Sequence, residues 1–135
     1  MRATAVIIKD GLILLMHRFR DGVEFYILPG GLVEEGETIE EAVIREVKEE
    51  TNFNAKIEKK LWEYLNEYNG NKKMHHFYLI TDFSGNMQLG GEEAERNSEK
   101  DKYILEWHKF KDVEDLPLKP DAIKEKIKNE FILKF

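Results

Sequence analysis

An acidic segment, residues 31–53 (GLVEEGETIEEAVIREVKEETNF), constrains this chain more than any other part of it. Between Glu34 and Glu50 the segment carries eight carboxylates against two bases, and this surplus equals the formal net charge of −6 of the whole protein. Like charges three or four residues apart destabilise a helix by roughly 0.2–0.5 kcal/mol per pair. A helix formed here needs compensation, and a bound divalent cation is the first candidate for it.

The same segment carries the signals of a well-defined helix. Thr38 is a suitable N-cap, and Glu41 stands three residues later, where it completes a capping box. No Gly or Pro interrupts the residues that follow, and Asn52 tolerates the left-handed conformation at which many helices end. We therefore predict a helix over residues 39–51.

Three carboxylates of this predicted helix share one face. At about 100° per residue, Glu46, Glu49 and Glu50 fall within an arc of roughly 100°. An apolar stripe adjoins this arc and consists of Val43, Ile44 and Val47. Carboxylates at the margin of a buried stripe are partly desolvated, which suits a hard cation. The alternative interpretation is a solvated acidic helix face.

The fixed positions of the segment form a recognisable spacing: Gly31, Glu37, Arg45-Glu46-Val47, Glu49-Glu50, Asn52 and Phe53. This spacing resembles the Nudix box, whose pattern is G-x5-E-x7-R-E-U-x-E-E-x-G-U, with U a bulky aliphatic residue. The chain departs from the pattern at Asn52, where the box has Gly, and at Phe53, which is aromatic. Because Asn is the next-best residue for a left-handed helix end, the first departure weakens the resemblance little.

The resemblance implies an α/β fold, in which a mixed β-sheet lies between helices and the box forms a loop–helix–loop. It also implies a hydrolase that cleaves a diphosphate link in a nucleoside diphosphate derivative with Mg²⁺ or Mn²⁺. Metal ligation is then expected from Glu46, Glu49, Glu50 and the carbonyl oxygen of Gly31. Glu46 is also a candidate general base, although in this family the base varies and can come from a distal loop. The candidates in that loop are Glu92, Glu93, Glu95 and Glu99.

Two further roles follow from the resemblance. Arg45 and Glu37 are expected to pair and to hold the loop against the helix, which supports catalysis through orientation. The alternative is an ordinary surface ion pair of little energetic value. Gly30 and Gly31 permit a close backbone approach to a metal or a phosphate, and they also suit a turn after Pro29.

The remaining candidates lie outside the box. Arg18, at the end of a predicted strand, is a candidate for contacting substrate phosphates, and its alternative is a surface arginine. Tyr26 and Phe77 are candidates for stacking on a base, although core packing is favoured for each. His75 and His76 are adjacent strand residues that point to opposite faces, so they are not expected to share one site.

Length and composition predict one domain over residues 1–135. No apolar run approaches the roughly 20 residues of a membrane span, the mean hydropathy is −0.56, and the N-terminus does not resemble a signal peptide. The chain has no cysteine, which fits a reducing cytoplasm. A pI near 5.3 argues against a stable nucleic-acid partner. A homodimer is one expectation, because dimers are common among relatives.

Hydrophobic patterning and turn residues predict an α/β organisation around the box. Asp10-Gly11 and Asn69-Gly70 predict turns, and Asp121 is a candidate N-cap for a C-terminal helix that buries Ile123 and Ile127. Residues 85–102 are polar and are expected to form a mobile loop. The predicted strands cover residues 3–8, 12–17, 24–28, 55–62, 76–81 and 104–110.

Three functions remain open from the sequence. The first is hydrolysis of nucleoside triphosphates, including oxidised ones, to monophosphate and pyrophosphate. The second is the same chemistry on ADP-ribose, another nucleotide sugar, a dinucleoside polyphosphate or a capped RNA. The third is a catalytically silent domain that senses a nucleotide. No box glutamate is lost, which favours an enzyme acting on a small nucleotide.

Overall fold

A computed structural model describes residues 1–132, except the side chains of Tyr68 and Glu92. A seven-stranded mixed sheet forms its centre, with the order β3-β2-β1-β7-β6, while β4 pairs with β1 and β9 pairs with β2. Only β1 and β7 are parallel among the described strand pairs of this sheet. The strands are β1 Arg2–Lys9, β2 Leu12–Arg20, β3 Val23–Ile27, β4 Gly30–Leu32, β6 Lys59–Tyr68, β7 Asn71–Ile80 and β9 Asp101–Lys109.

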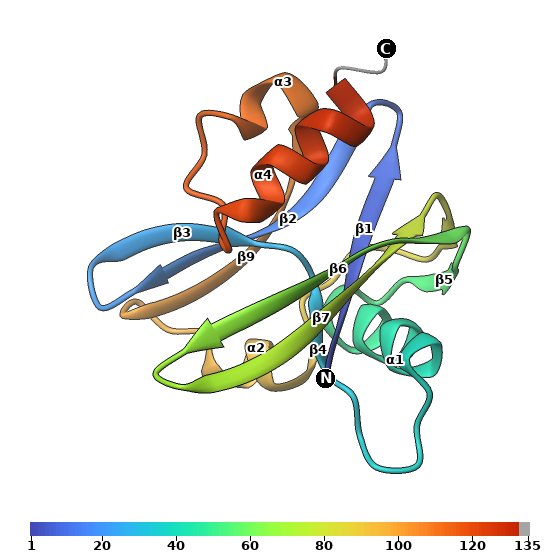
Figure 1. Ribbon diagram of the computed structural model, residues 1–135. Helices are drawn as coiled ribbons and strands as arrows, with labels where there is room; N and C mark the ends of the chain where they lie inside the picture. Colours follow the sequence, from blue (N-terminus) through green and yellow to red (C-terminus); the bar gives the residue numbers. More distant parts are fainter. Residues whose placement is uncertain (133–135) are drawn as a thin grey trace.

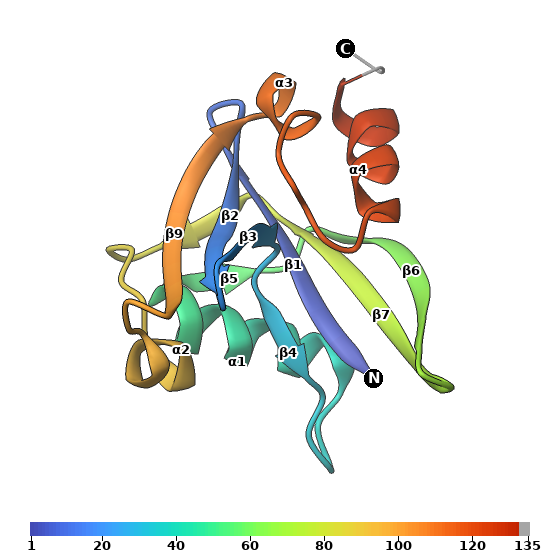
Figure 2. The same ribbon diagram turned by 90° about the vertical axis from the view of Figure 1, so that its left-hand side faces the viewer.

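Helices cover both faces of this sheet (Figures 1 and 2). The helix α1, Ile39–Thr51, packs on one face through Val43 and Val47. On the other face the helix α4, Ala122–Ile127, packs through Ile123 and Ile127. This arrangement confirms the predicted α/β/α sandwich. The remaining elements are the helices α2 Gly91–Arg96, α3 Phe110–Val113 and η1 Lys128–Ile132, and the paired strands β5 Asn54–Lys56 and β8 Asp82–Ser84.

Tight turns connect the hairpins where the sequence predicts them. Asp10 and Gly11 both have positive φ values, of 52° and 76°, as do Asn69 and Gly70, of 51° and 80°. Two successive residues with positive φ form the turn whose twist matches that of paired strands. These turns fix the registers of β1 with β2 and of β6 with β7.

Four element predictions are wrong in detail. The strand expected over residues 55–62 is divided between β5 and β6, because the chain leaves one sheet and enters another. The strand expected at residues 76–81 begins at Asn71, where long hairpin pairing with β6 extends it. Residues 30–32 form the strand β4 instead of a simple turn. Asp121 makes no capping hydrogen bond, since its carboxylate accepts a hydrogen bond from the Lys119 ammonium.

The polar segment 85–102 is more ordered in its contacts than the sequence predicts. It contains α2, and it lies against the carboxyl end of α1. The Gln88 N–H donates to the Thr51 carbonyl oxygen at 2.9 Å, and the Gly90 N–H donates to the Glu50 carbonyl oxygen at 3.3 Å. These donors satisfy carbonyl groups that the end of a helix leaves without partners. No helix within residues 1–132 is long and apolar enough to cross a membrane.

Candidate active site

The helix α1 begins and ends as its sequence predicts. The Thr38 hydroxyl accepts from the Glu41 N–H at 3.1 Å, and the Glu41 carboxylate accepts from the Thr38 N–H at 3.0 Å, which completes the capping box. Asn52 has φ 70° and closes the helix in the left-handed conformation. The helix therefore has a fixed start, a fixed end and a fixed angular position for its carboxylates.

Arg45 joins the loop before α1 to the helix itself. Its guanidinium donates to both carboxylate oxygens of Glu37, at 2.7 and 3.0 Å, and to the Leu32 carbonyl oxygen at 3.0 Å. The hydrogen bonds from Arg45, first of all, lower the pKa of Glu37 to about 2. Such a bidentate pair has a fixed geometry, so Arg45 and Glu37 hold the box loop against the helix and β4.

Arg45 also contacts two of the predicted metal ligands. Its Nη1 donates to Glu46 Oε1 at 2.8 Å and to Glu49 Oε2 at 3.2 Å. Burial raises the pKa of the Glu46 carboxyl, and the hydrogen bond from Arg45 partly opposes this rise. Glu46 is therefore half-buried, oriented by a cation and more basic than an exposed carboxylate.

Glu50 lies deeper than the other box carboxylates. It is 4% exposed, and its Oε2 accepts a hydrogen bond of 2.8 Å from the Gly30 N–H. Burial, followed by the negative charges of Glu93 and Glu46, raises its pKa well above the ordinary value, and a hydrogen bond with Glu93 adds to this rise. Isolated buried carboxylates are costly unless a cation or hydrogen bonds compensate them.

The two glycines of β4 make room for these carboxylates. A Cβ atom at Gly31 would overlap the carboxylate of Glu46, and one at Gly30 would overlap the backbone of β1. Gly30 and Gly31 therefore permit close packing on both sides of a strand, at the position where the sequence also allowed a turn. Gly30 approaches Glu50 and Gly31 approaches Glu46, which brings the backbone of β4 to two predicted metal ligands.

One acidic residue of the distal segment reaches the same place. Glu93, from α2, interacts with both Glu50 and Glu46. Glu93, Glu95 and Glu99 are the three candidates whose side chains are described, and of these Glu93 is the one that interacts with the box carboxylates. The side chain of the fourth candidate, Glu92, lies outside the described part of the structure. Sequence spacing could not identify Glu93, because it is more than 40 residues from the box helix.

The donor set fits a hard divalent cation. Within the described residues no three acidic or histidine side chains form a ready-made metal cage, since Arg45 already pairs with Glu46 and Glu49. Glu50, however, has no cationic partner in residues 1–132, although Glu46 and Glu93 bring further negative charge to it. Oxygen donors with surplus negative charge are the ligands that Mg²⁺ and Mn²⁺ prefer.

Arg18 and Tyr26, the two predicted substrate-binding residues outside the box, have structural contacts away from the acidic cluster. Arg18 is buried, forms an ion pair with Asp101, donates to the Lys102 carbonyl oxygen at 3.1 Å, and covers the ring of Tyr103 at 3.6 Å. These contacts tie β2 to β9, and the guanidinium also lies over the ring of Phe25 in β3. Tyr26 is buried in the core beside α4, where it stacks on His17 with ring centroids 4.1 Å apart. Core packing, the favoured interpretation of Tyr26, agrees with this position.

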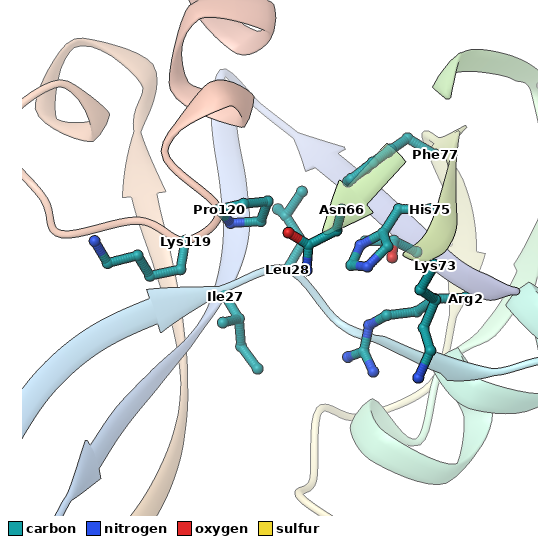
Figure 3. A pocket seen from close by; sticks show the side chains of 10 residues that line it. Arg2, Ile27, Leu28, Asn66, Lys73, His75, Phe77, Lys119 and Pro120 are labelled. Atoms are coloured by element: carbon teal, nitrogen blue, oxygen red, sulfur yellow. The ribbon is translucent and has the colours of Figure 1, made fainter. Parts of the chain in front are cut away.

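A cavity of about 360 Å³ opens on the face of the sheet opposite α1 (Figure 3). Its walls combine apolar side chains with cationic and polar ones. The sequence did not indicate that these residues form one site, because they come from five separate segments. The lining residues are Arg2, Thr4, Ile27, Leu28, Asn66, Lys73, His75, Phe77, Lys119 and Pro120.

Gly30 connects the cavity to the acidic cluster. The Arg2 guanidinium donates to the Gly30 carbonyl oxygen at 3.2 Å, while the N–H of the same glycine donates to Glu50. The Thr4 side chain also adjoins Gly30 and lines the cavity. The cavity and the carboxylates therefore lie on opposite sides of β4, and both contact the same residue, Gly30.

Comparisons with known proteins agree on one family. A family model described as NUDIX domain matches residues 1–131. An ADP-ribose pyrophosphatase of Methanocaldococcus jannaschii is 48% identical over 60 residues, which cover 44% of this chain and 36% of that protein. A Bacillus subtilis protein, provisionally named as an 8-oxo-dGTP diphosphatase, is 37% identical over 62 residues, which cover 46% of this chain and 41% of that protein. Each match spans less than half of the relative.

A solved structure extends the similarity to the whole fold. The MutT NUDIX hydrolase from Burkholderia pseudomallei matches with a TM-score of 0.73 and 26% sequence identity. The match covers 96% of this chain and 95% of that structure. The similarity therefore extends over nearly the full length of both chains.

Proposed function

The chain belongs to the Nudix family, and from this premise we propose that residues 1–135 form one metal-dependent pyrophosphohydrolase domain. Its substrates would be nucleoside diphosphate derivatives, cleaved at the diphosphate link. The observation that carries the proposal is the meeting of Glu46, Glu50 and Glu93 against the backbone of Gly30 and Gly31. A diphosphate anion and this acidic cluster repel each other unless cations lie between them.

Nudix hydrolases generally depend on divalent metals, and here Mg²⁺ or Mn²⁺ would be held by Glu46, Glu49, Glu50 and the Gly31 carbonyl oxygen. When bound, such a cation polarises the phosphoryl group and acidifies water. Glu93 is a further candidate for this set, because it already interacts with Glu50. The burial of the Glu50 carboxyl supports the assignment, since no described cation of the chain would compensate its negative charge when it is ionised.

The chain's own residues would position the water and accept its proton. Hydrolysis joins the water oxygen to one phosphorus atom and breaks the bridging P–O bond, and the departing group leaves with the bridging oxygen. Glu46 is the candidate general base, because burial raises its pKa and Arg45 fixes one of its oxygens. Arg45 and Glu37 would act through orientation, as their bidentate pair holds the loop in place.

The cavity behind β4 is the candidate site for the nucleoside. Its volume lies within the range of about 300–1,000 Å³ that is typical of small-molecule sites. Leu28 and Phe77 provide apolar contact, and Gly30 separates the cavity from the carboxylates by a single strand. Arg18 and Tyr26, which are engaged in ion pairing and core packing, support substrate binding less strongly than this cavity does.

Two substrate classes deserve comparison. The name of the Methanocaldococcus jannaschii relative favours ADP-ribose, and that of the Bacillus subtilis relative favours oxidised nucleoside triphosphates. The acidic pI gives no support to a stable nucleic-acid partner. The cytoplasmic location and the homodimer stay predictions.

A substrate panel with product identification tests the proposal. We expect Mg²⁺- or Mn²⁺-dependent hydrolysis of at least one nucleoside diphosphate derivative, and a loss of about 10²–10³-fold in kcat for Glu49→Gln or Glu50→Gln. Glu35→Gln, an exposed box carboxylate outside the cluster, is the matched control and should retain wild-type activity. Undiminished hydrolysis by Glu50→Gln would contradict the metal assignment. No hydrolysis across the panel would favour a nucleotide sensor.

A further inference from the structure

The cavity behind β4 carries positive charge on the side of the sheet opposite the acidic cluster. Arg2 lies directly across from His75 in the pairing of β1 with β7, and Lys73 is two residues from His75 on the same face of β7. Figure 3 shows both cationic side chains beside the His75 ring. Among the side chains that the structure describes, no carboxylate forms an ion pair with Arg2 or Lys73.

The lack of acidic partners contrasts with the neighbouring lysine. Lys72 points to the other face of β7 and pairs with Glu67 at 3.2 Å. On the cavity face, the charges of Arg2 and Lys73 act on His75, and with burial as the main cause they lower its pKa to about 4. The imidazole therefore stays neutral near pH 7, and the positive charge of this region comes from Arg2 and Lys73.

The floor of the cavity contains a second indication of a ligand. Thr4 is 4% exposed and lines the cavity, and its hydroxyl has no hydrogen-bond partner in the described structure. Buried polar atoms are normally hydrogen-bonded. A polar group of a bound molecule would supply the missing partner, while Phe77 and Leu28 would contact its apolar surface.

We propose that Arg2 and Lys73 recognise a phosphate monoester on the ribose of the substrate, in addition to the diphosphate that is cleaved. This inference rests on the proposed function. With the diphosphate at the carboxylates and the base against Phe77, the ribose lies beside Gly30. Arg2 is anchored to that glycine at 3.2 Å. Because β4 separates Arg2 from Glu46 and Glu50, the anion at Arg2 is distinct from the one at the acidic cluster.

Matched substrates test this assignment. We expect kcat/KM for 2′-phospho-ADP-ribose to exceed that for ADP-ribose by about tenfold, the factor expected for one charge-assisted contact. Lys73→Gln and Arg2→Gln should reduce the ratio toward one, whereas Lys73→Arg should keep it. Lys72→Gln, on the opposite face of the same strand, should leave the ratio at its wild-type value. A ratio of one in the wild type, or a preference that survives in the Arg2→Gln/Lys73→Gln double variant, overturns the proposal.

A binding measurement separates this proposal from the catalytic one. Calorimetry without divalent cations compares adenosine 2′,5′-bisphosphate with AMP, and needs no hydrolysis. We expect about tenfold tighter binding of the bisphosphate, with a preference that decreases at high salt and in Lys73→Gln. Equal affinities overturn the ribose-phosphate assignment. A further outcome is that the chain hydrolyses neither ADP-ribose nor 2′-phospho-ADP-ribose and still binds adenosine 2′,5′-bisphosphate more tightly than AMP. This result would show that ADP-ribose is not the substrate, and it would support the anion site at Arg2 and Lys73.

Discussion

Two buried ionisable side chains each lie near groups that carry the charge they would themselves carry, negative for Glu50 and positive for His75. Glu50 is held among other acidic groups, and burial raises its pKa, so its charged form is the costly one. His75 lies near Arg2 and Lys73, and burial lowers its pKa to about 4, so its charged form is also the costly one. Each is located where a ligand of opposite charge would remove the cost: a cation for Glu50 and an anion for His75.

The pKa of His75 predicts a window of acid sensitivity. Between its ordinary value of 6.5 and about 4, the folded chain binds fewer protons at this site than the unfolded chain does. Acidification through this window therefore stabilises the unfolded state, by up to about 3 kcal/mol for a shift of this size. His75→Gln should remove that contribution. Between pH 6.5 and about 4, the free energy of unfolding should therefore decrease more for the wild type than for the variant.

Urea denaturation at several pH values between 4 and 7.5 measures this difference. The wild type should lose more stability on acidification than His75→Gln, while Lys72→Gln should follow the wild type. Parallel pH profiles for wild type and His75→Gln would show that the imidazole is accessible to protons in the folded state.

Local spacing identified most of the residues of the candidate site, and distance along the chain explains the rest. Glu46, Glu49 and Glu50 follow from helix geometry, because their relative positions depend on residues within one element. The Arg45–Glu37 pair follows from the resemblance to the Nudix box. The approach of Glu93 depends on how residues 85–102 fold back on α1, which no local pattern specifies. Arg18 meets Asp101 across 83 residues, so its burial in an ion pair could not be predicted either.

At the scale of elements, α1 depends on its two ends. Its first turn is closed by the Thr38–Glu41 capping box, and its last turn by Asn52, whose Nδ2 donates to the Asn86 carbonyl oxygen at 2.9 Å. The second contact explains how the chain tolerates the departure from the box pattern. Asn52 adopts the left-handed conformation and also ties α1 to the segment that carries Glu93.

Substitutions of Asn52 should separate these two contributions. Asn52→Ala removes the polar side chain that makes the left-handed conformation tolerable and also removes the bond to Asn86. We therefore expect it to lower the free energy of unfolding by about 1–3 kcal/mol. Asn52→Gly keeps the conformation accessible and should cost about 1 kcal/mol or less. Urea denaturation measures both. Equal losses for the two variants would show that backbone conformation contributes little.

The element predictions failed where pairing overrides local pattern. Gly30 and Gly31 have the composition of a turn, yet pairing with Ala3 and Thr4 makes them a strand. Residues 71–75 are polar except for Met74, and β-hairpin pairing with β6 extends β7 through them. In both cases the deciding hydrogen bonds come from a strand that the local sequence does not contain.

At the scale of the whole molecule, the acidic surplus of the box is concentrated at one place in the fold. The rest of the chain balances nineteen acids with nineteen bases. Repulsion among Glu46, Glu50 and Glu93 therefore opposes folding locally unless a cation is bound. Global stability and cation binding should be linked.

Thermal denaturation should reveal this linkage. A cation that binds only the folded state adds about 2.7 kcal/mol at a hundred times its Kd, so Mn²⁺ should raise the Tm by several degrees over a chelator-treated sample. Glu50→Gln should raise the Tm of the metal-free protein at neutral pH, because a neutral amide replaces a buried charge, and should lose most of the Mn²⁺ effect. Glu35→Gln should respond to Mn²⁺ like the wild type. A Tm for wild type that is insensitive to Mn²⁺ would contradict the linkage.

The position of Gly30 has a consequence for how specificity can change in such a fold. Its N–H is bonded to Glu50 and its carbonyl oxygen to Arg2, so a single residue fixes the spacing between the reaction centre and the substrate cavity. Cavity side chains on β1 and β7 can be replaced while that spacing is kept. Exchange of these residues alone, with α1 and β4 untouched, is therefore the direct route to redirecting this scaffold toward a different nucleotide.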